Sequence, residues 1–491
     1  MVIQKKLNHY FLIFIIFLLP FIDFLKNNIN EIDIIIGKSF FFLILVLFLF
    51  LLLSVCAIKY FLKNASFYNI FLIIVVVYWL FFKHNFLKNS FNNFFNKLGL
   101  INFEYTSEIS LLVILILSFC VTVLIYKNNF FLKKFIFIFF YLTFFMTLAQ
   151  IIISNLKLNT NTTNSNEMNS INFVDKLNNE KKNIYFFILD GMQPIKEFED
   201  YYKLSLKEFL KYTENENYKY IDNTVNFYDN TTQSLSSLFY LGKILNKEGE
   251  LKNNKIVMYP TLLKKNNKSS LIRILNNLGY NFKMIGNFYA YCPKFNLKYC
   301  LNDNETKMVD YYLYINFFKQ TPLIQITLNL GSFFKFDYNK YFFYTLNDGI
   351  GRLINHLKKD SIVYKYNKPT FYFIHHMSPH RPYITNEDCS YKYYPGKINY
   401  EGYKAAYLCN LKKIEKTIKF LNIFDPDSIV VFQSDHNWEM SRGTEARKNI
   451  FNLLKIDDNC SIDHKVNLNN SNTLRLIFSC MTGNNPKFIN N

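Results

Sequence analysis

The stretch that decides the fold is Ile184-Tyr185-Phe186-Phe187-Ile188-Leu189-Asp190-Gly191. Its continuous apolar run, rich in β-branched and aromatic residues, is typical of a strand buried on both faces. Runs of the same kind predict strands at 371–375 and 428–433, and a further strand is expected at 281–286. Helical spacing predicts helices near 231–246, 271–279, 341–358 and 400–421. This alternation predicts an α/β domain with a mostly parallel sheet and helices on both faces.

Metal-type and acid–base side chains stand where three of these strands end. They are Asp190, His375, His376, His380, Asp435 and His436. Because open parallel sheets bind ligands beyond the carboxyl ends of their strands, we expect these side chains to converge on one rim. Such a group can hold a divalent metal and an anionic substrate. Taken singly, each part has a plainer interpretation: a turn-forming Asp-Gly, a hydrogen-bonded Asp–His pair, or structural histidines.

A hydroxyl-rich segment begins the predicted helix near 231–246. It is Asn230-Thr231-Thr232-Gln233-Ser234-Leu235-Ser236-Ser237. Serine and threonine are ordinary helix caps, which is one interpretation. The other is a nucleophile, because a hydroxyl bound to a divalent cation loses its proton more readily and a helix N-terminus stabilises phosphate.

The N-terminal part is apolar enough to cross a membrane about five times. The stretches lie near 9–25, 36–57, 66–82, 109–126 and 133–154, each close to the length that about 30 Å of hydrocarbon requires. The first lacks a small-residue cleavage site, so we expect it to stay in place. Lysines flank alternate ends of the spans and place the N-terminus in the cytoplasm, although the lysines of loop 83–108 oppose this pattern. We therefore expect a membrane domain over 1–154, a linker over 155–182 and an external catalytic domain over 183–491.

The chain carries a net charge of +19, from 56 Lys and Arg against 37 Asp and Glu. This excess is either a solvated lysine-rich surface or an aid to lying on anionic lipid. No nucleic-acid-binding motif accompanies it, so a nucleic-acid partner is not expected, and nothing predicts an oligomeric state.

Six of the eight cysteines follow the last predicted span. An even number in an exported domain predicts disulfides, and short loops favour Cys292–Cys300, Cys389–Cys409 and Cys460–Cys480. A structural zinc site is the alternative, but the chain has no CxxC pair.

The order of these motifs resembles the alkaline-phosphatase/sulfatase superfamily. It is most similar to the membrane-anchored branch with phosphoethanolamine transferases, lipoteichoic acid synthases and phosphoglycerol transferases. The matching segments are 183–191, 231–238, 376–383, 433–436 and 472–475, and the resemblance covers about 183–480. The five-span anchor is also similar to this branch. An alkaline-phosphatase-like fold is what this resemblance implies.

The resemblance also implies a site with one divalent metal, zinc or manganese. Asp190, Asp435 and His436 would be ligands, and Thr231 both ligand and nucleophile. His380, with or without His375, would bind the phosphate or protonate the leaving group.

Three departures stand against that pattern. Asn437 replaces a frequent glycine, no second histidine follows the Asp-His pair near 445–448, and the fit around Thr231 leaves Thr232 or Ser234 as other nucleophiles. A formylglycine sulfatase is disfavoured, because no Cys/Ser-x-Pro-x-Arg sequence exists.

The expected activity is transfer of a phosphoethanolamine- or phosphoglycerol-type group from a membrane phospholipid. An envelope glycan or lipid would accept it, through a threonine-linked intermediate, at the outer or periplasmic side of the cytoplasmic (inner) membrane. A sulfatase-like hydrolase or phosphodiesterase is the enzymatic alternative. A non-catalytic envelope membrane protein is the other, although the scarcity of ionisable residues in the spans opposes a transport path.

Overall fold

The computed structural model describes the following residues: 2–28, 38–87, 89–90, 107–126, 130–160, 182–252, 256–264, 269–287, 301, 317–318, 320–321, 340, 344, 348–360, 368–394, 399–456, 460 and 466–490. They fall into two compact units. One comprises Met1–Thr162 and Lys307–Phe336, and the other Thr163–Thr306 and Asp337–Asn491.

The second unit contains a mixed sheet of six strands in the order β2-β8-β7-β1-β4-β3. The strands β1 (Ile184–Leu189), β3 (Asn281–Ile285), β4 (Thr370–His376) and β7 (Ile429–Gln433) run parallel. The edge strands β8 (Asn452–Lys455) and β2 (Lys219–Tyr220) are antiparallel to their neighbours. The prediction of a mostly parallel sheet is confirmed.

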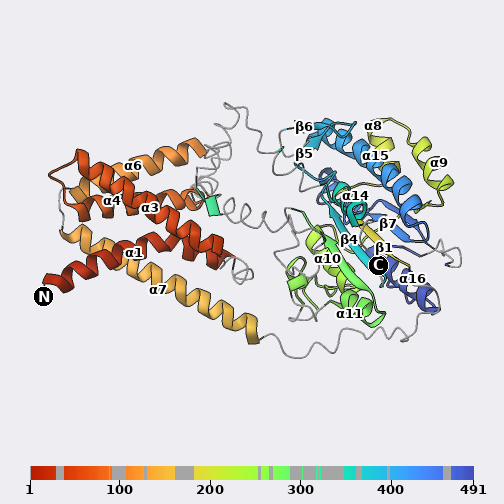
Figure 1. Ribbon diagram of the computed structural model, residues 1–491, viewed down its shortest axis with the longest axis horizontal. Helices are drawn as coiled ribbons and strands as arrows, with labels where there is room; N and C mark the ends of the chain where they lie inside the picture. The colour runs from red at the N-terminus through yellow and green to blue at the C-terminus, as the bar shows by residue number, and fades with distance from the viewer. Residues whose placement is uncertain are drawn as a thin grey trace. The chain divides into compact units, whose positions relative to one another are not determined.

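Helices cover both faces of this sheet (Figure 1). One face packs on α10 (Thr231–Tyr240), α11 (Ser270–Asn277) and α16 (Asn470–Thr482). The other packs on α8 (Ile195–Tyr202), α9 (Lys207–Asn215), α14 (Gly349–Asp360) and α15 (Tyr400–Phe424). Strand alternation divides β1 between the two cores, with Phe186 on the α10 side and Phe187 on the α15 side. Strand β1 lies inside the sheet, between β7 and β4, and burying each such side chain contributes about 1.5–3 kcal/mol.

Several short elements were not expected from the sequence. A hairpin of β5 (Tyr383–Thr385) and β6 (Tyr391–Tyr394) follows β4, and 3₁₀ turns occur at η2 (Thr261–Lys264), η7 (Glu439–Ser441) and η8 (Glu445–Lys448). The helix expected near 341–358 begins at Gly349, and of residues 341–347 only Tyr344 is described.

Among its described residues, the first unit has five long apolar helices. They are α1 (Val2–Asn27), α3 (Lys38–Phe61), α4 (Phe67–Phe82), α6 (Ser107–Tyr126) and α7 (Phe130–Thr160). Three contain stretches long and apolar enough to cross a membrane: Tyr10–Asn27, Phe40–Phe61 and Lys134–Ile153. The apolar stretches in α4 and α6 are shorter, so the five-span arrangement stays a prediction. Helix α7 continues past the expected boundary at 154 and ends at Thr160.

Part of the chain between β3 and α14 also belongs to the first unit. The ring of Phe317 is fully buried and stacks on Phe21 of α1 at 4.6 Å. It also lies 5.5 Å from Phe24 and 4.8 Å from Phe82, at the ends of α1 and α4. We expected one continuous catalytic domain over 183–491, and that expectation did not include a segment of this range, Lys307–Phe336, in the first unit.

Two of the three expected disulfides are present. They join Cys389 to Cys409 and Cys460 to Cys480. Cys56 and Cys120 are free, as expected of residues in apolar helices. The expected pair Cys292–Cys300 lies outside the described residues.

Candidate active site

The site lies at the carboxyl ends of three adjacent strands, β7, β1 and β4. The backbone N–H of Asp190 donates to the carbonyl of His376 at 2.9 Å, which ties the ends of β1 and β4 together. Gly191 then turns the chain with φ +71°, a conformation that favours glycine. A Cβ there would lie 3.6 Å from His436 Cε1 and 3.7 Å from His380, so this turn brings the backbone close to both imidazoles.

Two buried carboxylates form the centre of the site. Asp435 Oδ1 accepts from the backbone N–H groups of Gly191 at 3.1 Å and His436 at 3.0 Å. Asp190 Oδ1 and Asp435 Oδ2 are buried and have no hydrogen-bond partner among the described residues. Unpartnered buried carboxylate oxygens are costly unless they coordinate a metal.

The donor atoms fit a divalent cation. Asp190, His375 and Asp435 each offer one ligand atom, and these atoms lie within 4.8 Å of one another. The Nε2 atom of His436 lies 3.6 Å from Asp190 Oδ1 and 3.5 Å from Asp435 Oδ2. Mixed oxygen and nitrogen donors of this kind suit zinc or manganese.

The ring of His436 is oriented by its neighbour's backbone. Its Nδ1 lies 2.7 Å from the carbonyl of Asn437, which can only accept, so Nδ1 carries the proton in the neutral ring. The same carbonyl accepts from Arg447 Nη1. The lone pair of His436 Nε2 therefore faces the hydroxyl of Thr231, which lies 3.1 Å away.

Thr231 reaches the site because it is the first residue of α10. The side chain of Asn230 caps this helix by accepting from the backbone N–H of Gln233 at 3.0 Å, which leaves the Thr231 hydroxyl available. Ser234 is fully buried and donates to the carbonyl of Tyr228 at 3.0 Å. Of these two hydroxyls, Thr231 is the one in contact with His436.

The two adjacent histidines of β4 point to opposite faces of the sheet. His375 Nε2 lies 3.0 Å from Asp190 Oδ2, and its Nδ1 lies 3.0 Å from the hydroxyl of Tyr259. His376 instead contacts Asn410 of α15 at 3.1 Å. The expectation that both would join one rim is therefore wrong for His376, because successive side chains of a strand alternate between its faces.

His380 lies beside the carboxylates, on the loop after β4. Its Nδ1–H donates to the carbonyl of Arg381 at 2.7 Å, and its ring centroid lies 6.3 Å from that of His436. Burial raises the pKa of Asp190, but His380, His375 and His436 together lower it below its ordinary value. Asp190 is thus held as a carboxylate.

Two residues of the site were missed by sequence reasoning. Tyr259 comes from the segment before η2 and supports His375, and nothing in its local sequence marks it. Arg447 of η8 is buried, which lowers its pKa, while Asp435 and Asp190 raise it. Arg447 lies in the region where the resemblance predicts a second histidine. This position along the sequence is the feature that could have identified Arg447 as a site residue.

The comparisons with known proteins find structural similarity only. No protein-family model matches the chain, and no curated protein matches it in sequence. Among solved structures, the lipooligosaccharide phosphoethanolamine transferase EptA of Neisseria meningitidis is 12% identical, with a TM-score of 0.41 over 96% of this chain and 99% of that one.

Two further structures are similar to part of the chain. The periplasmic domain of EptC from Escherichia coli, in complex with zinc, is 14% identical over 58% of this chain and 76% of that one, with a TM-score of 0.37. The lipoteichoic acid synthase LtaP of Listeria monocytogenes is 14% identical over 56% and 65%, with a TM-score of 0.32. These scores describe a distant similarity.

Proposed function

We propose that this protein is a metal-dependent, membrane-anchored transferase that moves a phospho-substituent from a lipid to an envelope glycan or lipid. One observation carries the proposal. The hydroxyl of Thr231 contacts His436 Nε2 beside two buried carboxylates, each with an unpartnered oxygen. A hydroxyl at a helix N-terminus next to a cation site is arranged for attack on phosphorus.

Asp190, Asp435 and His436 would hold a zinc or manganese ion together with Thr231, and His375 is within reach as a further donor. When bound, the cation would lower the pKa of the Thr231 hydroxyl and stabilise negative charge on the phosphate. The lone pair of His436 Nε2 can serve the metal or accept the threonine proton, but not both at once. We assign it to the metal, so the hydroxyl proton leaves to water.

Thr231 Oγ1 then attacks phosphorus, and the bond between phosphorus and the lipid oxygen breaks. His380, in its doubly protonated form, gives the Nε2 proton to that oxygen, while its Nδ1–H stays bonded to the Arg381 carbonyl. In the second half, the acceptor hydroxyl loses its proton to Nε2 of the now neutral His380 and attacks the same phosphorus. The bond between phosphorus and Thr231 Oγ1 breaks, and the threonine oxygen regains a proton from water.

The membrane unit supports a lipid donor on the outer side of the cytoplasmic membrane. Phe317, which follows all five apolar helices in sequence, packs against Phe21 and Phe82. In the five-span arrangement, the ends of α1 and α4 that carry these residues face the side on which the chain leaves α7. In that arrangement, Phe317 therefore lies at the same end of the apolar helices as the C-terminal end of α7.

The test compares variants of the full-length protein in lipid vesicles, with release of diacylglycerol as the readout. Thr231→Ala should abolish turnover, and His380→Ala should slow it by roughly 10²–10⁴-fold, the usual scale for a general acid or base. Ser234→Val is the matched control and should retain turnover if the fold is kept.

Full activity of Thr231→Ala, with Thr232→Ala inactive, would move the nucleophile by one residue. Full activity of all the hydroxyl variants would reject the covalent route and favour the hydrolase, in which water attacks directly.

A further inference from the structure

The contact between Thr231 and His436 joins two segments that lie far apart in the chain. Thr231 begins α10, His436 follows β7, and the Thr231 hydroxyl lies 3.1 Å from His436 Nε2. This distance depends on how the start of α10 lies against the loop after β7. A group that bonds to both segments therefore sets the geometry of these two side chains.

Arg447 bonds to both segments. It is 7% exposed, and its Nε–H donates at 3.2 Å to the carbonyl of Asp229, two residues before the hydroxyl. Its Nη1–H donates to the carbonyl of Asn437, the residue that follows the metal-type histidine. The backbone N–H of Asn437 donates in turn to the carbonyl of Arg447 at 2.9 Å. Because a guanidinium is planar and presents its donors in a fixed geometry, it holds the two carbonyls at a set separation.

The carbonyl of Asn437 also accepts from Nδ1–H of His436, at 2.7 Å, so its position decides where the Nε2 lone pair points. The side chain of Asn437 fixes this position. Its amide donates to Glu197 Oε2 at 2.6 Å and to the carbonyl of Ala446 at 2.9 Å. Glu197 is itself held, because its Oε1 accepts from the amide of Asn449 at 2.6 Å. The loop that carries His436 is thus tied to α8 on one side and to η8 on the other.

We propose that Arg447, Asn437 and Glu197 form a clamp that holds Thr231 and His436 at their working distance. Arg447 acts in this clamp as a positioning residue, through the two carbonyls, and not as a ligand of the substrate. The proposal rests on the proposed transferase function, in which Thr231 is the nucleophile and His436 a metal ligand. Asn437 and Arg447 both stand where the sequence departs from the family pattern, so the clamp belongs to this chain.

The experiment compares Arg447→Lys with the wild type, using the full-length protein in detergent. Lysine keeps the positive charge, but its ammonium lacks the planar fork that spans two carbonyls. With bis(p-nitrophenyl) phosphate as substrate, kcat should fall about 10–100-fold, the usual cost of losing a group that orients a metal ligand. KM should change by less than about twofold, because no ground-state contact with the substrate is lost. Isothermal titration of the metal-free protein with zinc should show binding weakened by about tenfold or more.

Glu197→Gln is a milder change to the same clamp, and it tests the proposal even where Arg447→Lys does not fold. Glutamine offers one acceptor oxygen in place of two, so either Asn437 or Asn449 loses its acceptor. Both kcat and zinc affinity should fall about 3–10-fold, the worth of one hydrogen bond.

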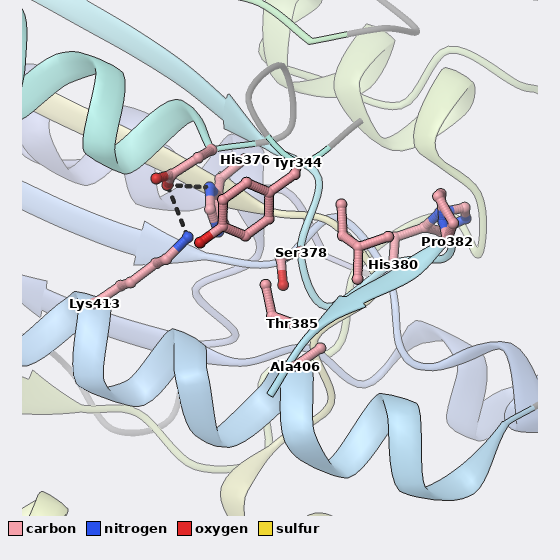
Figure 2. Close-up of a pocket in the computed structure, with 10 residues that line it drawn as sticks. Tyr344, His376, Ser378, His380, Pro382, Thr385, Ala406 and Lys413 are labelled. Carbon is pink, nitrogen blue, oxygen red and sulfur yellow. Dashed lines mark hydrogen bonds and ion pairs between the residues drawn. The ribbon is translucent and has the colours of Figure 1, made fainter. Parts of the chain in front are cut away.

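Lys413→Met is the matched control for lost stability. Lys413 is also a largely buried cation, with 16% of its side chain exposed, and its Nζ lies 2.9 Å from Asp348. Figure 2 shows Lys413 and His376 linked to this one carboxylate. The pair lies on the α15 side of the sheet, away from α10, since His376 contacts Asn410 of α15. Lys413→Met should therefore lower Tm but leave kcat, KM and zinc affinity unchanged.

Wild-type kcat and zinc affinity in Arg447→Lys would show that the charge alone is needed and would overturn the clamp. A raised KM with unchanged kcat would make Arg447 a ligand of the substrate and would also overturn it, as would equal losses in Lys413→Met. A wild type that binds zinc but cleaves no phosphodiester would reject the proposed function. In that case zinc affinity still decides, because weaker binding by Arg447→Lys and Glu197→Gln supports the clamp and equal binding overturns it.

Discussion

Replacing Asp435 by asparagine should change stability in opposite directions with and without metal. Asp435 is fully buried, and its Oδ2 has no partner among the described residues. In Asp435→Asn, the amide oxygen can still accept from Gly191 and His436, while the amide N–H₂ takes the place of Oδ2, 3.5 Å from His436 Nε2. The metal-free variant therefore loses an unsatisfied buried charge and gains a donor toward a lone pair.

Satisfying a buried group of this kind is worth about 1–3 kcal/mol, part of which is offset by the lost attraction between Asp435 and Arg447. For a domain of this size, the net gain corresponds to a rise of a few degrees in Tm. The wild type should gain about 2.7 kcal/mol at a metal concentration 100 times Kd, and the variant should gain much less because a charged ligand is missing.

Thermal unfolding of the full-length protein in detergent, followed with a chelator and then with zinc or manganese, measures both effects. The reasoning fails if the variant is the less stable protein in chelator. It also fails if the two proteins gain equally from metal.

Three other expectations follow from the same structure. Gly191→Ala should cost about 1–2 kcal/mol of stability, because the backbone there is left-handed at φ +71°, while its Cβ would make only ordinary contacts with His436 and His380; thermal unfolding checks this, and an unchanged Tm would contradict it. Burial raises the pKa of Asp348, but Lys413 and His376 lower it more, so that the pKa lies below its ordinary value. The Asp348 carboxylate therefore stabilises the fold above pH about 4, and this contribution is lost as the pH falls. Between pH about 5 and 3, Tm should drop less in Asp348→Asn than in the wild type, and equal drops would refute the assignment. A C-terminal alkaline phosphatase fusion should be active and a C-terminal green fluorescent protein fusion dark, whereas the reverse pattern would place the catalytic unit in the cytoplasm.

The sequence was sufficient for the parts of the site that depend on strand ends. Continuous apolar runs predict β1, β4 and β7, and because parallel strands present their carboxyl ends to one rim, the same runs predict that Asp190 and Asp435 lie close together. Thr231 could be placed for a similar reason, since a helix start is a local signal. The edge strands β2 and β8 are too short to show a period and were not predicted.

Other features depend on pairing that no local pattern encodes. The sequence predicts His376 beside His375, but strand alternation separates them and turns His376 toward Asn410 of α15. Tyr259 and Arg447 come from segments far apart in sequence, and only tertiary packing brings them to the site. The packing of Phe317 against α1 and α4 also joins segments that lie far apart in sequence.

The central claim is that Thr231 becomes covalently bound to the phospho-substituent, and peptide mapping by mass spectrometry tests it most directly. The full-length protein would be mixed with zinc or manganese and phospholipid vesicles, quenched in acid within one turnover and digested. We predict a mass increase equal to the donor's headgroup phosphate on the peptide that contains Thr231, with fragmentation assigning it to that residue and with no such adduct in Thr231→Ala. Turnover without any adduct, or an adduct located on Thr232 or Ser234, would contradict the account.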